Sequence, residues 1–332
     1  MGKSSVEKVF FVAMMVFLGL GCKSNLVPTK PSDILGSELE SPSKPDQTDP
    51  PIESLPEPLP EPPSSPTLPP TPLPVSVVTM IGAGDIGWCG LRGAEETGKL
   101  LDGVPGATVF TLGDNAYMNG SMENFMQCYD PFWGRFKNRT RPALGNHDYQ
   151  TPGAQDYFRY FGMSSSMAYY SFELGGWHIV VMDTSGNIRG GSVQLAWLRQ
   201  DLSKNSKLCT LVYQHYPLIS SGPNGDNFFL RDEWNILQEF KVDLVLAGHD
   251  HFYERFGKLD SDGRPSPNGI RQIIAGTGGA RLYDFQMIKP GSENRASVWG
   301  VLKLVLSPVL YQWEFIPIQG ETFRDFGKSK CQ

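Results

Sequence analysis

From residue 75 onward, hydrophobic positions follow two alternating patterns. Short apolar runs predict strands, and the segments between them carry apolar residues at helical spacing, as Leu195, Leu198 and Leu202 do. The predicted strands are residues 75–83, 107–112, 168–172, 177–183, 209–214, 242–247, 270–275, 298–306 and 309–316. The predicted helices are residues 94–101, 192–202 and 230–240. This alternation predicts an α/β fold with two packed sheets and helices outside them.

The first 74 residues follow a different pattern. Lys3 and Lys8 precede a 13-residue apolar run, Val9 to Gly21, which is typical of an export signal and too short to cross a bilayer comfortably. Residues 28–74 contain 16 of the 27 prolines, so we expect an extended, unpacked linker. The chain is therefore divided into a signal at 1–22, a Pro-rich linker at 23–74 and a folded domain at 75–332.

The charge balance excludes one class of partner. The chain has 29 Lys and Arg against 35 Asp and Glu, a formal net charge of −6. Nucleic acid is usually held by a basic surface that neutralises many phosphates, so we expect no nucleic-acid partner. Any phosphate that this protein binds needs a local cation.

Five short segments carry residue types that ligate metals. Four of them directly follow predicted strands, and together the five contain four of the five histidines. Ligand sites in α/β sheets lie beyond the carboxyl ends of the strands, so we expect these side chains to converge. The segments are Gly84-Asp85-Ile86-Gly87, Gly113-Asp114-Asn115-Ala116-Tyr117, Gly145-Asn146-His147-Asp148, Val212-Tyr213-Gln214-His215 and Gly248-His249-Asp250-His251.

An exported domain would fold under oxidising conditions, where its four cysteines can form disulfides. Cys89 and Cys128 are expected in loops that follow two of the ligand segments, so this pair is our first choice for a disulfide. Cys209 lies in a predicted apolar strand and is expected to be a buried thiol. Three pairings of Cys89, Cys128, Cys209 and Cys331 remain open.

The order of the five segments resembles the metallophosphoesterase superfamily and, more narrowly, the purple acid phosphatases, over residues 75–318. Gly87 stands where ordinary members of the superfamily have a histidine, and Tyr117 is an added ligand. Both features match the purple acid phosphatases. The resemblance implies a four-layer α/β/β/α sandwich of two mixed sheets and a catalytic domain with two metal ions. One ion would be held by Asp85, Tyr117 and His251 and the other by Asn146, His215 and His249, with Asp114 bridging them.

The ligand types suggest which metals these are. Carboxylate and phenolate ligands suit Fe(III), whereas two imidazoles and an amide oxygen suit a divalent ion such as Zn, Mn or Fe. The resemblance implies phosphomonoester hydrolysis by a hydroxide that the metals activate. His147 would donate a proton or a hydrogen bond to the substrate, or else orient Asn146, and Asp148 would fix the tautomer of His147.

Other functions remain open. The same metals serve phosphodiesterases and nucleotidases, and a surface lipoprotein could use the fold for binding without turnover. Calcium is disfavoured by three imidazole ligands, and a structural zinc site would prefer cysteines. The segment after His215 lacks the further histidines of many relatives, so Tyr216 and Asn224 are candidates to replace them. His178 is expected to face a strand neighbour, away from any metal.

The end of the export signal carries a second resemblance. Leu18-Gly19-Leu20-Gly21-Cys22 is similar to the lipobox of bacterial lipoproteins, which implies lipid attachment at Cys22. Lys23 in place of Asp favours the outer membrane. We therefore expect an exported cell-envelope lipoprotein that contacts the membrane through its lipid and acts on small phosphate esters, with no protein partner predicted. The alternative is ordinary cleavage and secretion.

Overall fold

The computed structural model describes residues 76–332, so the expected signal, Cys22 and the whole expected linker lie outside the described residues. The strands are β1 (Val78–Ala83), β2 (Thr108–Leu112), β3 (Thr140–Ala143), β4 (Tyr170–Leu174), β5 (Trp177–Val181), β6 (Cys209–Tyr213), β7 (Leu244–Ala247), β8 (Tyr253–Leu259), β9 (Ile270–Ala275), β10 (Ser292–Ala296), β11 (Gly300–Ser307), β12 (Leu310–Pro317) and β13 (Asp325–Lys330). The α-helices are α1 (Gly93–Asp102), α2 (Met122–Asn124), α3 (Asp130–Trp133), α4 (Gln155–Phe161), α5 (Val193–Lys204) and α6 (Arg231–Glu239). Short 3₁₀ turns and a π turn, Phe125–Tyr129, complete the described elements.

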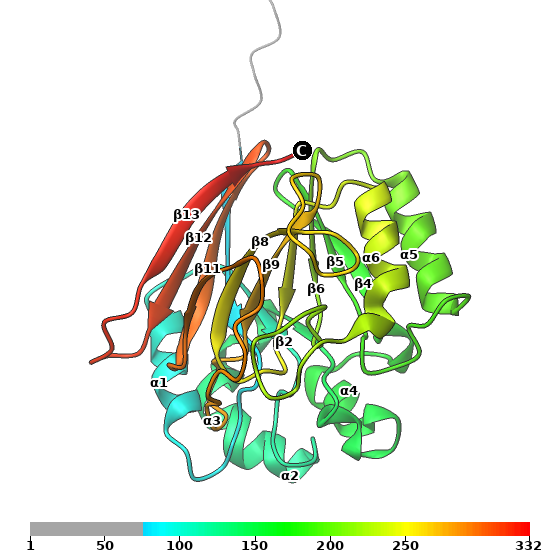
Figure 1. The fold of residues 1–332 in the computed structure, drawn as a ribbon. Coiled ribbons are helices and arrows are strands. Elements are labelled where there is room, and N and C mark those ends of the chain that lie inside the picture. Colours follow the sequence, from blue (N-terminus) through cyan, green and yellow to red (C-terminus); the bar gives the residue numbers. More distant parts are fainter. Residues whose placement is uncertain (1–75) are drawn as a thin grey trace, which may run out of the picture. The chain divides into compact units, whose positions relative to one another are not determined.

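The strands form two mixed sheets (Figure 1). One sheet has the order β13-β12-β11-β1-β2-β3, and the other has the order β10-β8-β9-β7-β6-β5-β4. Strands β1, β2 and β3 are parallel to one another, as are β5, β6, β7 and β9. A parallel strand with covered faces is apolar along its whole length, and every residue of β6 is indeed buried.

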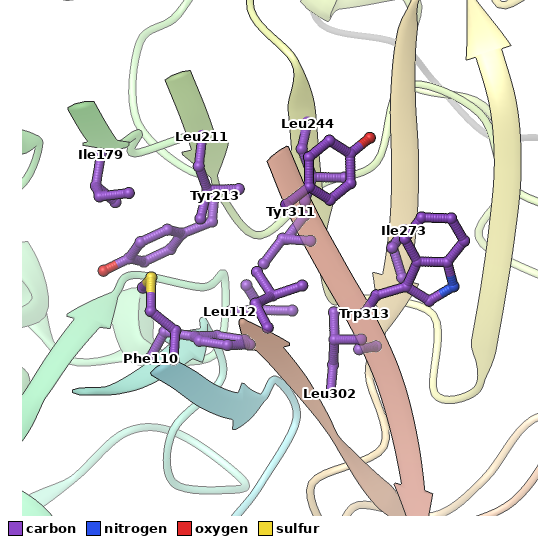
Figure 2. Close-up of a cluster of buried hydrophobic side chains, with 14 of the residues drawn as sticks. Phe110, Leu112, Ile179, Leu211, Tyr213, Leu244, Ile273, Leu302, Tyr311 and Trp313 are labelled. Atoms are coloured by element: carbon purple, nitrogen blue, oxygen red, sulfur yellow. The ribbon is translucent and has the colours of Figure 1, made fainter. Parts of the chain in front are cut away.

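Three apolar cores separate four layers. The central core lies between the sheets and contains Phe110, Leu211 and Trp313, with further side chains shown in Figure 2. A second core joins the seven-stranded sheet to α5 and α6, and a third joins the other sheet to α1, α3 and α4. The expected α/β architecture of two mixed sheets with outer helices is confirmed.

The predicted helices and strands are all present with small shifts of their ends, but four strands were not predicted. β3 has the sequence Thr-Arg-Pro-Ala, and proline suits only the edge of a sheet, where β3 lies. β8, β10 and β13 are rich in polar and charged residues, so they lack an apolar run. Sequence patterns favour strands that contain several apolar residues.

Two disulfides connect parts of the described domain. Cys89 bonds to Cys128, with 4.8 Å between their Cα atoms, although Cys128 lies in the π turn rather than in a loop. The expectation for Cys209 was wrong, because it bonds to Cys331. Cys331 follows β13, and its backbone N–H donates to the carbonyl of Val309, which places it beside β6. Among the helices of residues 76–332, none is both long and apolar enough to span a bilayer.

Candidate metal centre

The ligand segments lie at the carboxyl ends of five strands. Asp85 follows β1, Asp114 follows β2 and Asn146 follows β3, while His215 follows β6 and His249 follows β7. Hydrogen bonds tie the loops of the two sheets together: the backbone N–H of His249 donates to Asp85 Oδ2 at 2.8 Å, and His215 Nδ1 donates to the carbonyl of Leu112 at 2.7 Å. The two sheets therefore present one shared set of loops, and sequence-distant ligands meet there.

Three of the expected ligands have strained backbones. Asp85, Asp114 and His249 have φ angles of 60°, 50° and 71°, in the left-handed region that non-glycine residues rarely adopt. Among the described non-glycine residues, Ala154 and Lys241 are the others with positive φ. Strain of this kind persists where the surroundings fix it, commonly at functional sites. It turns each ligand side chain inward immediately after its strand ends.

The first half of the centre gathers around the hydroxyl group of Tyr117. This oxygen lies 2.8 Å from Asp85 Oδ1, 2.9 Å from Asp114 Oδ2 and 3.0 Å from His251 Nε2. All four side chains are buried. His251 Nδ1 lies 2.7 Å from the carbonyl oxygen of Arg281, which can only accept, so Nδ1 carries the proton and Nε2 offers a lone pair. A single phenol hydrogen cannot satisfy three acceptors, whereas a cation could be shared by all of these atoms.

The second half gathers around His215. Its Nε2 atom lies 3.0 Å from Asn146 Oδ1, 3.2 Å from His249 Nδ1 and 3.4 Å from Asp114 Oδ2. His215 Nδ1 donates to the carbonyl of Leu112 at 2.7 Å, so Nε2 again faces inward with a lone pair. The two halves meet at Asp114 Oδ2. The structure thus brings together all seven expected ligands.

Electrostatics favour a cation at this place. Asp85 and Asp114 are fully buried, and within residues 76–332 their ion-pair partners are histidines, without any Lys or Arg. Burial would raise the pKa of Asp114, but His215 and His147 lower it below its ordinary value. Burial, Asp114 and Asp85 raise the pKa of Tyr117 well above 10.0. A phenolate is therefore disfavoured unless a multivalent cation offsets the neighbouring carboxylates.

Comparison with known proteins identifies the family of this chain. Residues 80–253, more than half of the chain, match the calcineurin-like phosphoesterase family. The chain belongs to the calcineurin-like phosphoesterases. It is similar to purple acid phosphatase 23 of Arabidopsis thaliana, with 31% identity over 169 residues that cover 44% of this chain and 37% of the relative. Purple acid phosphatase 18 of the same plant is 30% identical over 228 residues, 61% of this chain and 50% of the relative.

A solved structure supports the same fold. A purple acid phosphatase from yellow lupin (Lupinus luteus) seeds has a TM-score of 0.68 and 20% identity, covering 76% of this phosphoesterase and 54% of that chain. At this identity the likeness concerns the fold. The chain spans half or less of the length of the two Arabidopsis relatives.

His147 lies at the mouth of the phosphoesterase centre. Its backbone N–H donates to Asp114 Oδ1 at 2.8 Å, and its Nδ1 contacts the carbonyl oxygen of Met118. The proton is thereby placed on Nδ1 in the neutral ring. The Nε2 atom lies 3.9 Å from Asp114 Oδ2, and the side chain is 27% exposed. The His147 side chain is therefore partly open to solvent.

Asp148 does not fix the tautomer of His147, so that expectation was wrong. The Asp148 carboxylate turns the other way and accepts hydrogen bonds from Asn115 Nδ2 at 3.0 Å and the backbone N–H of Gly145 at 2.9 Å. Burial and the charge of Asp114 raise the pKa of Asp148 to about 7. Its role is to hold the loops after β2 and β3 together. Gly145 is required there, because a Cβ atom would lie 2.1 Å from Asp114 Oδ1.

Of the remaining candidate residues, one lies away from the centre and two contact a ligand. His178 contacts Glu173 and Asp201, each at 2.7 Å, as expected for a residue that faces its strand neighbour. Asn224 Nδ2 donates to the backbone carbonyl of His249 at 3.0 Å, so it supports a ligand rather than replacing a histidine. The Tyr216 ring packs against that of His249, with 4.2 Å between centroids.

Two aromatic residues at the centre were missed. The Tyr283 ring stacks on His251 at 4.0 Å and 14°, and Trp88 packs on Tyr117 at 5.0 Å. Trp88 could have been found, since it directly follows a ligand segment. Tyr283 carries no such signal, because it reaches His251 only through the loop between β9 and β10.

Proposed function

We propose that this protein is a dinuclear phosphomonoesterase of the purple acid phosphatase type. The overall reaction adds water across a phosphate ester and yields an alcohol and inorganic phosphate. One observation carries the proposal: two sets of ligand atoms, each with its own chemistry, share the Asp114 Oδ2 atom. A structural site for a single ion would not need this second set.

The donor atoms fit two different ions. Asp85, Tyr117 and His251 would hold Fe(III), because two of these ligands are anionic oxygens. Asn146, His215 and His249 would hold a divalent ion such as Zn, Fe or Mn, and Asp114 would contact both. When bound, two such ions supply an activated water and positive charge for the phosphoryl oxygens.

The protein's own groups have separate roles. The backbone N–H of His147 fixes Asp114 Oδ1, which leaves Oδ2 directed into the centre, where it would help to hold the ions. His147 Nε2 would donate a hydrogen bond or a proton to the leaving oxygen when the ring is protonated, because Nδ1 holds the hydrogen of the neutral ring. Asn224 holds the backbone of His249 in place.

The test combines metal analysis with a substrate panel. The full chain, supplied with iron and zinc, is expected to bind two ions and to release phosphate from monoesters faster than it cleaves bis(p-nitrophenyl) phosphate. Fewer than two ions per chain at full turnover would contradict the two-metal mechanism. Faster cleavage of the diester would instead favour the phosphodiesterase alternative. Two bound ions without any hydrolysis would favour a binding lipoprotein.

We also propose that the protein is exported and anchored through a lipid on Cys22. Two disulfides in the domain support an oxidising compartment, where such bonds persist. Labelling with a radioactive fatty acid should mark the full chain and fail with Cys22→Ala. Labelling that survives this substitution, or a wild-type protein found only in the medium, would favour ordinary secretion.

A further inference from the structure

A pocket of about 240 Å³ lies beside the second half of the metal centre. Its walls come from the loop after β5 and from two aromatic residues after β6. The residues that line the pocket include Thr184, Ser185, Asn187, Arg189, Tyr216 and Phe229. Tyr216 is shared with the metal centre, since its ring also packs against His215 at 5.3 Å and His249 at 4.2 Å. Tyr216 is therefore the residue that connects this pocket to the metal centre.

The walls offer aromatic surface and a cation. The rings of Tyr216 and Phe229 meet edge to face, with 5.6 Å between centroids and 77° between planes. Arg189 is exposed, and its guanidinium carbon lies 6.0 Å from the centroid of Phe229. None of the ion pairs within residues 76–332 includes Arg189. The hydroxyl oxygen of Ser185 is buried and has no hydrogen-bond partner among the described residues.

We propose that this pocket binds the leaving group and favours monoesters of a planar aromatic alcohol that carries a second anionic group. This inference rests on the proposed phosphomonoesterase function. The aromatic ring would lie against Tyr216 and Phe229, and the anionic group would pair with Arg189. Alkyl phosphates gain none of these contacts.

The size of the pocket narrows the substrate class. Drug-sized ligands commonly occupy roughly 300–1,000 Å³, so 240 Å³ suits a single substituted ring better than a nucleoside. Carboxylated aryl phosphates are the simplest members of this class. The open side of the pocket would leave the carboxylate in contact with solvent and Arg189.

The test compares kcat/KM for 4-carboxyphenyl phosphate, phenyl phosphate and ethyl phosphate, using the metal-loaded full chain. In Arg189→Gln, the preference for the carboxylated ring over phenyl phosphate should fall about tenfold, the factor that one charge-assisted contact supplies. In Phe229→Leu, the kcat/KM values of both aryl substrates should fall relative to that of ethyl phosphate. Leaving-group acidity cancels, because the substrates are identical for every variant.

Arg231→Gln is the matched control. Arg231 also lies over a phenylalanine, with its guanidinium carbon 4.5 Å from the Phe228 centroid, but it pairs with Asp262 and does not line the pocket. Its substrate preference should match that of the wild type. Equal losses for all three substrates in Arg189→Gln, or an unchanged preference, would overturn the inference.

Calorimetry separates this inference from the proposed activity. The wild type should bind 4-carboxybenzenephosphonate about tenfold more tightly than benzenephosphonate, and Arg189→Gln should remove the difference. If no monoester is hydrolysed, the proposed function fails, yet these two phosphonates still decide the role of the pocket. Equal affinity of the wild type for both would refute it.

Discussion

The two halves of the metal centre differ in charge and in access. Asp85, Tyr117 and His251 are buried, with exposed fractions of 0%, 1% and 3%, and two of them are potential anions. In the second half none of the ligands is an anion, and Asn146 and His249 are only half-buried. Under the proposed function, the buried set with its anionic oxygens would hold one highly charged ion firmly, whereas the less buried set without anions would leave room for a substrate. The different roles proposed for the two halves thus depend on their burial as much as on their ligand types.

The largest effect is expected from a substitution of Asp114, the one ligand that both halves share. Asp114→Asn should lower phosphate release by at least about a thousandfold, since both ions lose a charged ligand. Metal analysis should show reduced occupancy of both halves. His178→Gln is the control, because that histidine pairs with Glu173 and Asp201 instead of the centre. Undiminished turnover of Asp114→Asn would exclude the shared-carboxylate arrangement.

The next effect concerns the mouth. His147→Asn keeps the backbone N–H that binds Asp114 but removes the imidazole, so kcat should fall about a hundredfold for esters of poor leaving groups. Metal content should stay at two ions. A smaller loss for p-nitrophenyl phosphate, whose leaving group needs no proton, would identify His147 as the donor. Equal losses for all esters would leave only a positioning role.

The first half alone is tested by Tyr117→Phe. This change removes the phenol oxygen that contacts Asp85, Asp114 and His251, and we expect about a tenfold loss of activity. A visible phenolate-to-iron(III) band should be present in the wild type and absent from the variant. Tyr283→Phe is the control, because that ring stacks on His251 and has no place in the ligand set. A colourless, fully active wild type would show that Tyr117 is not a ligand.

The smallest effect concerns the free energy of unfolding and the buried Glu233, which lies near the second half of the centre. Burial raises the pKa of Glu233 to about 8, and Gln214, the neighbour of His215, opposes the rise only in part. A folded-state pKa above the unfolded value of 4.5 means that the unfolded chain loses its proton first. Stability should therefore fall as the pH rises from about 5 to 8, by roughly 1–3 kcal/mol. Urea unfolding of Glu233→Gln should show a weaker pH dependence, and an identical dependence would contradict this origin.

The sequence predicted best those site residues that a single short segment contains. Each ligand lies within a few residues of a strand end, so Asp85, Asp114 and His215 could be recognised from the segment that contains them. It predicted least well the direction in which a side chain points and the contacts between residues far apart in the chain. Asp148 adjoins His147 but turns toward Asn115, and Cys209 meets a cysteine 122 residues away. Such contacts depend on how the two sheets pack.

The same dependence explains why the pocket was not foreseen. Arg189 lies in the loop after β5 and Phe229 in the 3₁₀ turn Phe228–Leu230, and neither adjoins a ligand segment. Only the packing of Tyr216 between Phe229 and His249 connects them to the centre. A specificity pocket built from loops of this kind has no signature in the order of residues.

The left-handed turns at Asp85, Asp114 and His249 limit how this centre can be transplanted. An engineer who copied seven side chains onto an ordinary sheet would find three of them aimed wrongly, because standard strand ends do not supply positive φ angles. Glycine at these turns would relax the main chain but remove the coordinating groups. A successful graft must therefore copy the bends themselves.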